Sequence, residues 1–396
     1  MKKVWGFLVL LASSFATSQT FSHVVIIVQE NRTPDNLFST CNIAGADAVI
    51  PPKGSVIGLV DGTDPGHTHT DFVNEAGGSY QTHDYDYVSD PLIQPYCTLG
   101  SEYGFANRMY QTNQGPSTPA HDFIFAGSSQ LNAGSDLFLS ELVGGGCPTN
   151  AEATFINSAG VEGDYGTDCL YINSMPTLLT GASLTWRYYT PSEGDIWTAP
   201  VQYEELCQSV GKKCSAPNWD SLVVTNPPQV LTDILDGTLA TVSWVIPSAA
   251  NSDHPSLNTG GGPAWVTSIV NAIGESPFYW TNTAILITWD DWGGWYDHVS
   301  PLTNDTGFCE QYCYGFRVPL LVISAYTPAM ADNDTHDFGS FLHFIENNFD
   351  LASLGVADKY ADALAEFFVK GPPRTYQPIE LTRGFDKDDR GDPDDY

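Results

Sequence analysis

Two pairs of polar side chains stand out because each follows an apolar run of the chain. Glu30 with Asn31 forms one pair, and Asp290 with Asp291 forms the other. Both apolar runs are rich in β-branched residues, as is typical of buried parallel strands. Because the carboxyl ends of parallel strands meet at one edge of a sheet, we expect three carboxylates and one amide to converge there.

Carboxylates packed so closely repel one another unless a divalent cation joins them. Hard oxygen ligands suit Mg²⁺, Ca²⁺ or Mn²⁺, and an added histidine would allow Zn²⁺. The sequence therefore predicts one divalent metal ion held by Glu30, Asn31, Asp290 and Asp291. The alternative is that each pair is only a solvated strand end or a helix cap.

A serine stands just before a predicted helix. Ser117 precedes Pro119 and the apolar residues of the predicted helix 118–129. The positive end of a helix dipole stabilises an alkoxide or a phosphoryl group, so Ser117 is a candidate nucleophile. The alternative is an ordinary serine N-cap.

Three histidines lie in segments with the composition of shaped loops. His67 ends the turn at 64–67, and His254 precedes a proline and a run of glycines. His298 follows Gly293 and Gly294, which permit close backbone approach. We expect His298 to orient a ligand or a phosphate oxygen, although a lone histidine is more often a packing or surface residue.

The elements that must position these groups alternate between strands and helices. Buried strands are predicted at 23–28, 184–189, 241–246, 283–289 and 318–325, and helices at 118–129, 265–273 and 337–350. This alternation predicts an α/β fold: a three-layer α/β/α sandwich with a mostly parallel central sheet. The Gly-rich stretches at 39–105 and 130–175 show little periodicity and are predicted as long loop regions.

The beginning of the chain has the pattern of an export signal. Lys2 and Lys3 precede an apolar stretch too short to span a bilayer, and a small-x-small pattern follows. Residues 1–19 are therefore predicted to be a signal peptide of a secreted protein, either extracellular or periplasmic, without a stable membrane anchor. Residues 20–383 form the predicted domain, and 384–396 an acidic, disordered tail.

The charge balance excludes some partners. The net charge is −32 with only 15 Lys and Arg, and a phosphate backbone or an anionic membrane needs a basic surface. Nucleic acid is therefore not expected as a partner, and oligomeric state is left open. Such an acidic surface suits an acidic habitat, with plain solubility as the alternative.

An even number of cysteines, eight, fits disulfides in an oxidising compartment. Two pairs close in sequence, Cys207 with Cys214 and Cys309 with Cys313, could each close a short loop. The pairing of the other four is left open: Cys41, Cys97, Cys147 and Cys169. None of the cysteines has a zinc-ribbon spacing.

Six segments together resemble one family. They are VQENRTPDNLF at 28–38, DPGH at 64–67, GPSTP at 115–119, DHP at 253–255, TWDDWGGWYDHV at 288–299 and RVPLLVIS at 317–324. In this order they resemble the bacterial phospholipase C and acid phosphatase family of phosphoesterases, within the alkaline-phosphatase-like superfamily. The first and fifth segments are specific, and the others support them.

The resemblance implies a role for each candidate residue. The implied metal ligands are Glu30, Asn31, Asp290 and Asp291, and the implied catalytic residues are Ser117 as nucleophile with His254 and His67. Asn31, His298 and Arg32 are the expected contacts to substrate. An alkaline-phosphatase-like fold and a phosphoesterase domain at 20–383 are also implied.

The sequence departs from the family pattern at several positions. Thr33 and Pro34 replace a usual Ser-Phe, Asp291 stands where lipases often have Glu, and Ala120 with His121 replaces a usual Asn-Arg. Three functions remain open at this point. They are phospholipase C-like hydrolysis of phosphodiesters, which we favour, acid phosphatase activity on phosphomonoesters, and a non-catalytic secreted binding protein on the same fold.

Overall fold

The computed structural model describes residues 19–141, 144–149, 151–302, 308–309 and 312–385. The predicted signal peptide at 1–19 and the predicted acidic tail at 384–396 lie almost entirely outside the described residues. Within the described part of the chain, no helix has both the length and the apolar composition that crossing a bilayer requires.

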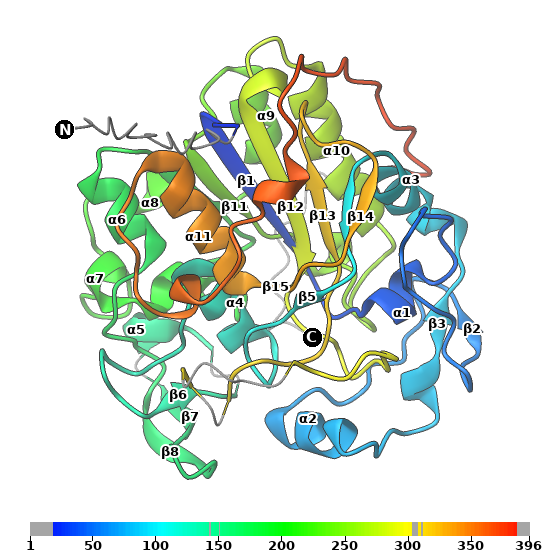
Figure 1. Ribbon diagram of the computed structural model, residues 1–396. Coiled ribbons are helices and arrows are strands. Elements are labelled where there is room, and N and C mark those ends of the chain that lie inside the picture. The colour runs from blue at the N-terminus through cyan, green and yellow to red at the C-terminus, as the bar shows by residue number, and fades with distance from the viewer. Residues whose placement is uncertain (1–18, 142–143, 150, 303–307, 310–311, 386–396) are drawn as a thin grey trace, which may run out of the picture.

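An eight-stranded sheet forms the centre of the molecule (Figure 1), with the strand order β10-β9-β11-β1-β12-β13-β4-β14. Its strands are β1 His23–Gln29, β4 Gly104–Ala106, β9 Trp186–Tyr189, β10 Val223–Val224, β11 Val242–Val245, β12 Thr283–Trp289, β13 Leu320–Ile323 and β14 Met330–Asp332. The five strands from β10 to β12 are parallel to one another. The predicted, mostly parallel sheet is confirmed.

The central pair of strands is β1 and β12. They run parallel in register from His23 opposite Thr283 to Gln29 opposite Trp289. Every residue of β12 is buried, as are the last six residues of β1, because helices cover both faces of the sheet. The register brings the two predicted polar pairs to the same edge of the sheet.

β13 runs antiparallel to β12, and β4 runs antiparallel to β13. A parallel neighbour would need a long crossover that returns the chain to the opposite edge of the sheet. Here the chain leaves β12 at the carboxyl edge and enters β13 from that same edge, so no crossover helix is needed.

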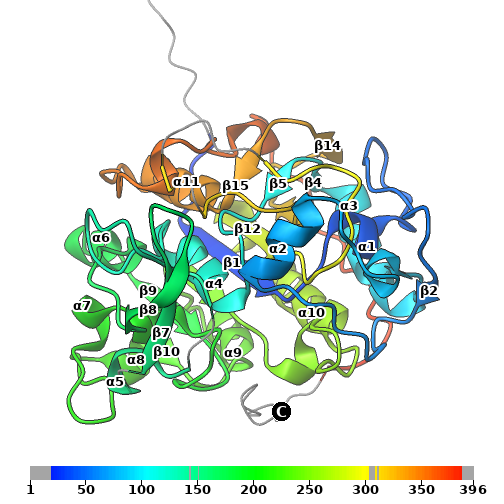
Figure 2. The ribbon, with the colours of Figure 1, turned by 90° about the horizontal axis from the view of Figure 1, so that it is seen from below.

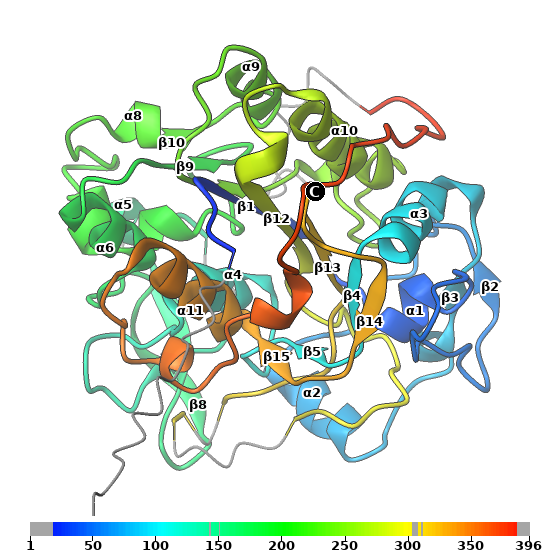
Figure 3. The same ribbon diagram turned by 45° about the horizontal axis from the view of Figure 1, so that its top comes forward.

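Helices cover the sheet on both faces (Figures 2 and 3), which completes the predicted three layers. On one face α10 Gly262–Glu275 contacts α3 Gln94–Glu102 and α9 Gln229–Leu235, and on the other α11 Phe338–Phe349 contacts α4 Ser117–Ala126. α4 ends at Gly127 with φ +71°, a left-handed conformation that favours glycine. The predicted helices 118–129, 265–273 and 337–350 are thus confirmed with shifted ends.

Two regions that we predicted as loops contain secondary structure. Residues 130–175 include a three-stranded antiparallel sheet, whose last strand has no buried residue and therefore no apolar signal in the sequence. Its strands are β6 Phe138–Leu139, β7 Glu152–Ile156 and β8 Glu162–Thr167. Residues 39–105 include α2 His69–Ala76, α3 and a short pair of strands, β2 Val56–Ile57 and β3 Tyr87–Val88.

The remaining elements are short. They are α1 Pro34–Phe38, α5 Gly146–Thr149, α6 Met175–Gly181, α7 Glu204–Cys207, α8 Trp219–Leu222, β5 Met109–Tyr110 and β15 His336–Asp337. The 3₁₀ turns are η1 His83–Tyr85, η2 Pro91–Ile93, η3 Ala199–Gln202, η4 Ala249–Asn251, η5 Trp280–Asn282, η6 Ala357–Lys359 and η7 Ala365–Phe367.

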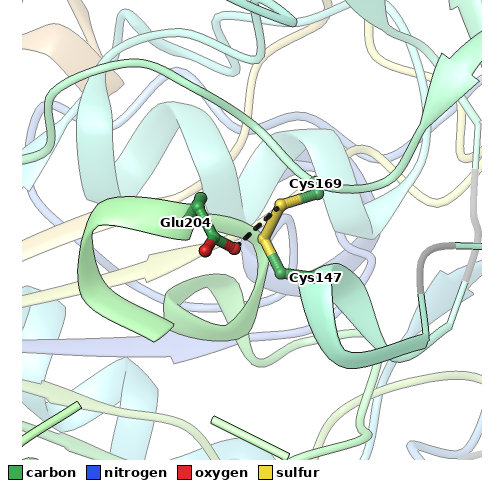
Figure 4. A group of neighbouring side chains, drawn as sticks. All are labelled: Cys147, Cys169 and Glu204. Carbon is green, nitrogen blue, oxygen red and sulfur yellow. Dashed lines mark hydrogen bonds between the residues drawn. A yellow bond between two sulfur atoms is a disulfide. The ribbon is translucent and has the colours of Figure 1, made fainter. Parts of the chain in front are cut away.

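All eight cysteines are paired. The two short-range pairs are the predicted ones, and the open pairing resolves into Cys41 with Cys97 and Cys147 with Cys169. Figure 4 shows Glu204 directed at the second of these bridges, with Oε2 3.7 Å from Sγ of Cys169. Because the S–S bond uses both sulfurs, this group offers no thiolate to a metal ion.

Candidate active site

The carboxyl ends of β1 and β12 bring three carboxylates together. Glu30, Asp290 and Asp291 are all fully buried. The pairing of the strands continues past their ends, since the backbone N–H of Asp290 donates to Gln29 O at 2.9 Å. Asn31 has φ +58°, a left-handed conformation that Asn adopts more readily than most residues, and its N–H donates to Oδ1 of Asp290 at 3.0 Å.

Two glycines let the backbone fold closely around this edge. A Cβ at Gly293 would lie 2.6 Å from the carbonyl oxygen of Asn31, and one at Gly294 would lie 2.5 Å from that of Gly66. Both glycines also have positive φ. The close backbone approach predicted for this pair is confirmed.

Ser117 is the first residue of α4, which points its N-terminus at the carboxylates. Its Oγ lies 3.3 Å from Oε2 of Glu30 and 3.2 Å from Oδ2 of Asp291, both at hydrogen-bond distance. The serine is buried, and no side-chain cap bond is made at this end of the helix. The hydroxyl is therefore turned toward the acidic groups instead of capping the helix.

His121 is a member of this site that we did not predict. It lies one helical turn after Ser117, and its Nε2 is 3.1 Å from Oε1 of Glu30 and 4.0 Å from Oδ2 of Asp290. Residues four apart on a helix share a face, so the spacing from Ser117 was the sequence signal that could have found it.

The amide of Asn31 separates the carboxylates from two histidines. One end of the amide lies 3.1 Å from Nε2 of His67 and 3.2 Å from Nε2 of His254. The other end lies 3.3 Å from Oε2 of Glu30 and 3.2 Å from Oδ1 of Asp290. The two histidines predicted to be catalytic therefore converge on one point next to the acidic cluster.

The protons on these two histidine rings determine which end of the Asn31 amide faces them. Nδ1 of His67 lies 2.9 Å from Pro65 O, and Nδ1 of His254 lies 2.5 Å from Pro255 O. A carbonyl only accepts, so each Nδ1 carries a proton, and Nε2 of a neutral ring is an acceptor. Beside neutral rings the amide nitrogen of Asn31 faces the histidines. Beside rings that are protonated at Nε2 the amide is reversed, and its nitrogen donates to Glu30 and Asp290.

Three buried carboxylates lie at one place beside one end of the Asn31 amide, which fits a divalent cation. Burial, and after it the neighbouring Asp290, raises the pKa of both Glu30 and Asp291 well above the ordinary range. Within the described residues, no Lys or Arg forms an ion pair with any of the three. Asp290 Oδ2 is buried without a hydrogen-bond partner. A cation would satisfy these oxygens.

Arg32 is placed differently from the prediction that it contacts substrate. Its side chain is buried, and its guanidinium donates to Asp253 O at 2.8 Å and to Oδ1 of Asn36 at 3.1 Å. It also lies over the ring of Trp295. These contacts tie Arg32 to the loop that carries His254, and a contact from Arg32 to substrate stays a prediction.

His298 belongs to a second group of charges. Its Nδ1 lies 2.8 Å from Oδ2 of Asp35, and the buried Arg317 pairs with Asp297 at 2.8 Å and with Asp35 at 3.4 Å. The guanidinium neutralises these carboxylates, so this group does not need a metal ion. The hydrogen-bond partners of the His298 ring in the described part of the chain are Asp35 and Arg317, and a contact from His298 to substrate stays a prediction.

A surface hollow of about 620 Å³ lies elsewhere. Thr185 and Trp186, at the amino end of β9, are among its lining residues. The hollow therefore opens at the amino ends of the parallel strands, whereas Ser117 lies at their carboxyl ends. It holds no cluster of acidic side chains or histidines. The acidic cluster around Glu30 therefore does not open into this hollow.

The sequence of this chain is similar to those of several phospholipases C. Phospholipase C B of Mycobacterium tuberculosis is 25% identical over 391 residues, covering 83% of this chain and 73% of that protein. The hemolytic phospholipase C of Pseudomonas aeruginosa is 22% identical over 410 residues, covering 84% of this chain but only 53% of that protein. Non-specific phospholipase C6 of Arabidopsis thaliana is 25% identical over 316 residues, covering 75% and 55%.

Among solved structures, a protein of the alkaline phosphatase superfamily from Vibrio parahaemolyticus is similar with a TM-score of 0.43 and 12% identity, covering 87% of this chain and 71% of that one. The model of the Phosphoesterase family matches residues 61–352, well over half of the 396 residues. The chain thus belongs to the Phosphoesterase family and is a hydrolase that acts on phosphoric ester bonds.

Proposed function

We propose that this protein is a secreted, metal-dependent phosphoesterase that cleaves phosphodiesters of the phospholipid type through a phosphoseryl intermediate. The observation that carries the proposal is the position of the Ser117 hydroxyl, within 3.3 Å of two buried carboxylates at the N-terminus of α4. A nucleophile, acidic metal ligands and two convergent histidines are the parts that phosphoryl transfer requires.

The residues that would hold the cation are Glu30, Asn31, Asp290 and Asp291. When bound there, a divalent ion lowers the pKa of a nearby hydroxyl and polarises a phosphoryl oxygen. Its positive charge would also offset the acidic surroundings for an anionic substrate, since the net charge of the chain is −32.

Ser117 would act as the nucleophile. Its Oγ–H points to Oε2 of Glu30 and Oδ2 of Asp291, which can receive the proton as the bond from Oγ to phosphorus forms. The positive end of the α4 dipole favours the negative charge that develops on the phosphoryl oxygens. The bond from phosphorus to the leaving alcohol breaks in the same step.

His254 or His67 would protonate the leaving alcohol. Both Nε2 atoms lie about one hydrogen bond from the same end of the Asn31 amide, and both rings are fixed through Nδ1 by a backbone carbonyl. The acid would be the ring in its protonated form, in which Nδ1–H stays on the carbonyl and Nε2–H gives its proton to the leaving alcohol. Water would then hydrolyse the phosphoseryl group and restore Ser117.

The choice of phosphodiesters rests on the relatives, which are named phospholipases C. Secretion is proposed from the predicted signal peptide and is supported by the four disulfides. A non-catalytic binding protein would have no use for a serine hydroxyl held against two metal-binding carboxylates, so we do not favour it.

The test compares two substrates with purified protein of known metal content. Phosphatidylcholine as the diester and p-nitrophenyl phosphate as the monoester are assayed across pH, with and without a chelator. We expect faster turnover of the diester and loss of both activities with the chelator. Faster turnover of the monoester would make the protein an acid phosphatase, and activity without any divalent ion would contradict the proposed site.

A further inference from the structure

His121 presents a ring nitrogen to the acidic cluster from the side of α4. The side chain is buried, and its Nε2 lies 3.1 Å from Oε1 of Glu30. Asp290 Oδ2, 4.0 Å from the same nitrogen, is fully buried and has no hydrogen-bond partner. One atom from each of the three residues lies within 4.8 Å of the others, as in a site that shares one cation.

The other nitrogen of the ring fixes its tautomer. The hydroxyl of Tyr188, on β9, donates its only hydrogen to Trp197 O at 2.5 Å. The Tyr188 oxygen can therefore only accept from Nδ1 of His121, 3.4 Å away. A neutral imidazole that donates from Nδ1 has a lone pair on Nε2.

That lone pair faces two groups that also only accept. Oε1 of Glu30 and Oδ2 of Asp290, when ionised, cannot donate to Nε2, so three acceptors would meet without a hydrogen between them. Either an added proton or a cation must join them. On the other side of the cluster one end of the Asn31 amide lies 3.3 Å from Oε2 of Glu30 and 3.2 Å from Oδ1 of Asp290. A single cation between Nε2 of His121, Glu30 and Asp290 would satisfy all three acceptors.

We propose that Nε2 of His121 is a ligand of the metal ion held by Glu30 and Asp290, and that this nitrogen makes the site selective for Zn²⁺ over Mg²⁺ and Ca²⁺. Imidazole suits transition metals, whereas Mg²⁺ and Ca²⁺ take oxygen ligands. The inference rests on the proposed function, because it names the class of metal that the same site uses.

The rival role for His121 is that of a protonated ring that only neutralises the carboxylates. An arginine could take that role, since it is always charged, but it has no lone pair to give to a metal ion. Replacing His121 by Leu removes both roles, and replacing it by Arg keeps the charge alone. The two variants therefore separate a ligand from a counter-ion.

The experiment uses the full-length protein, stripped of metal and reloaded with Mn²⁺ or Zn²⁺. Electron spin echo envelope modulation of the Mn²⁺ form reports directly bonded nitrogen, and calorimetry gives the affinities for Zn²⁺ and Mg²⁺. The matched control is His83→Leu, because the His83 side chain is 72% exposed and pairs only with Asp86 among the ion pairs of the described residues.

We expect nitrogen modulation in the wild type and in His83→Leu, and none in His121→Leu or His121→Arg. The Zn²⁺ affinity of both His121 variants should fall at least about 100-fold, the upper end of the loss caused by removing an outer partner of a ligand. The Mg²⁺ affinity should change much less, so that the preference for Zn²⁺ disappears.

Nitrogen modulation that persists in folded His121→Leu, or a Zn²⁺ preference that survives in His121→Arg, would overturn the inference and leave the proposed function standing. The proposed function itself fails if Asp290→Ala keeps the metal content and the activity. If His121→Leu does not fold, His121→Asn, which is polar and cannot supply an imidazole nitrogen, decides the same question.

Discussion

Oγ of Ser117 lies 3.2 Å from Oδ2 of Asp291, although 174 residues separate the two positions. The contact joins the start of α4 to the end of β12, and Glu30, at the end of β1, completes it. Three elements thus meet at the carboxyl edge of the sheet, where α/β folds place their chemistry. The catalytic role of this site and the contacts that stabilise it can each be tested by substitution.

Replacing Ser117 by Ala should lower kcat at least about 10⁴-fold, as expected when a nucleophile is removed. The fold and the metal content should stay the same, because the side chain is small and donates only to groups that a cation also satisfies. Turnover is measured together with melting temperature and metal content. Ser101→Ala, on the exposed end of α3, is the control and should keep full activity. An active Ser117→Ala protein would remove the nucleophile assignment.

Replacing Asp290 by Ala should release the metal ion. Oδ2 of this carboxylate has no hydrogen-bond partner, and Oδ1 accepts from the Asn31 N–H, so the loss of the side chain removes a metal ligand and one buried hydrogen bond. Elemental analysis after desalting should find the ion in the wild type and in the exposed control Asp220→Ala, but not in Asp290→Ala. A chelator should lower the melting temperature of the wild type and leave that of Asp290→Ala unchanged, since only a bound ion stabilises the folded state.

Replacing Gly293 by Ala should lower both stability and activity. The added Cβ would lie 2.6 Å from Asn31 O, and φ is +63°, where an L-residue costs about 1–2 kcal/mol. Relief of the clash must move Asn31, so kcat should fall further than the loss of stability explains. Urea unfolding and turnover are compared with those of Gly62→Ala, whose Cβ would meet nothing within 4 Å. Equal activity in both variants would contradict this account of the loop.

Glu75 should make the protein less stable as the pH rises. Burial raises the pKa of this carboxyl from 4.5 to about 9, and Nε1 of Trp292 donates to it at 2.6 Å. Because the folded state holds the proton more tightly, the contribution is complete below pH 4.5 and is lost as the pH rises through about 9.

The variant Glu75→Gln keeps the shape and an acceptor for Trp292 but cannot lose a proton. Urea denaturation should therefore show that the unfolding free energy of Glu75→Gln, relative to that of the wild type, rises between pH 5 and pH 9. Glu102→Gln, at a partly exposed carboxyl, serves as the control. A constant difference between Glu75→Gln and the wild type across this range would show that the carboxyl is not protonated in the folded protein.

Among the charged side chains of the loops around the site, Arg317 should contribute most to the free energy of unfolding. Its guanidinium is buried and pairs with Asp297, Asp35 and Asp47. Arg317→Met would leave buried carboxylates without a partner, which costs about 3–5 kcal/mol of unfolding free energy. Arg108→Met, which removes a half-exposed partner of Asp47, should cost only about 0–1 kcal/mol. Similar losses in both variants would argue against a special role for the buried arginine.

The sequence by itself determined the central pair of strands and the polar groups that follow them. The apolar runs of β1 and β12 are continuous, and such runs occur in strands that are buried on both faces. The alternation with helices then implied a parallel arrangement, which places Glu30, Asn31, Asp290 and Asp291 at one edge. The need for Gly293 and Gly294 could also be read from the sequence, because close backbone contact requires residues without a side chain.

Only the tertiary structure decided which distant side chains meet. His121 contacts Glu30 because α4 crosses the end of β1 at one particular angle, and Arg32 turns inward because Asp253 O lies there to receive it. The antiparallel β13 and the two long-range disulfides depend in the same way on the path of the loops. Local patterns record which face of an element is buried, but a contact between residues far apart in sequence depends on how all the elements pack together.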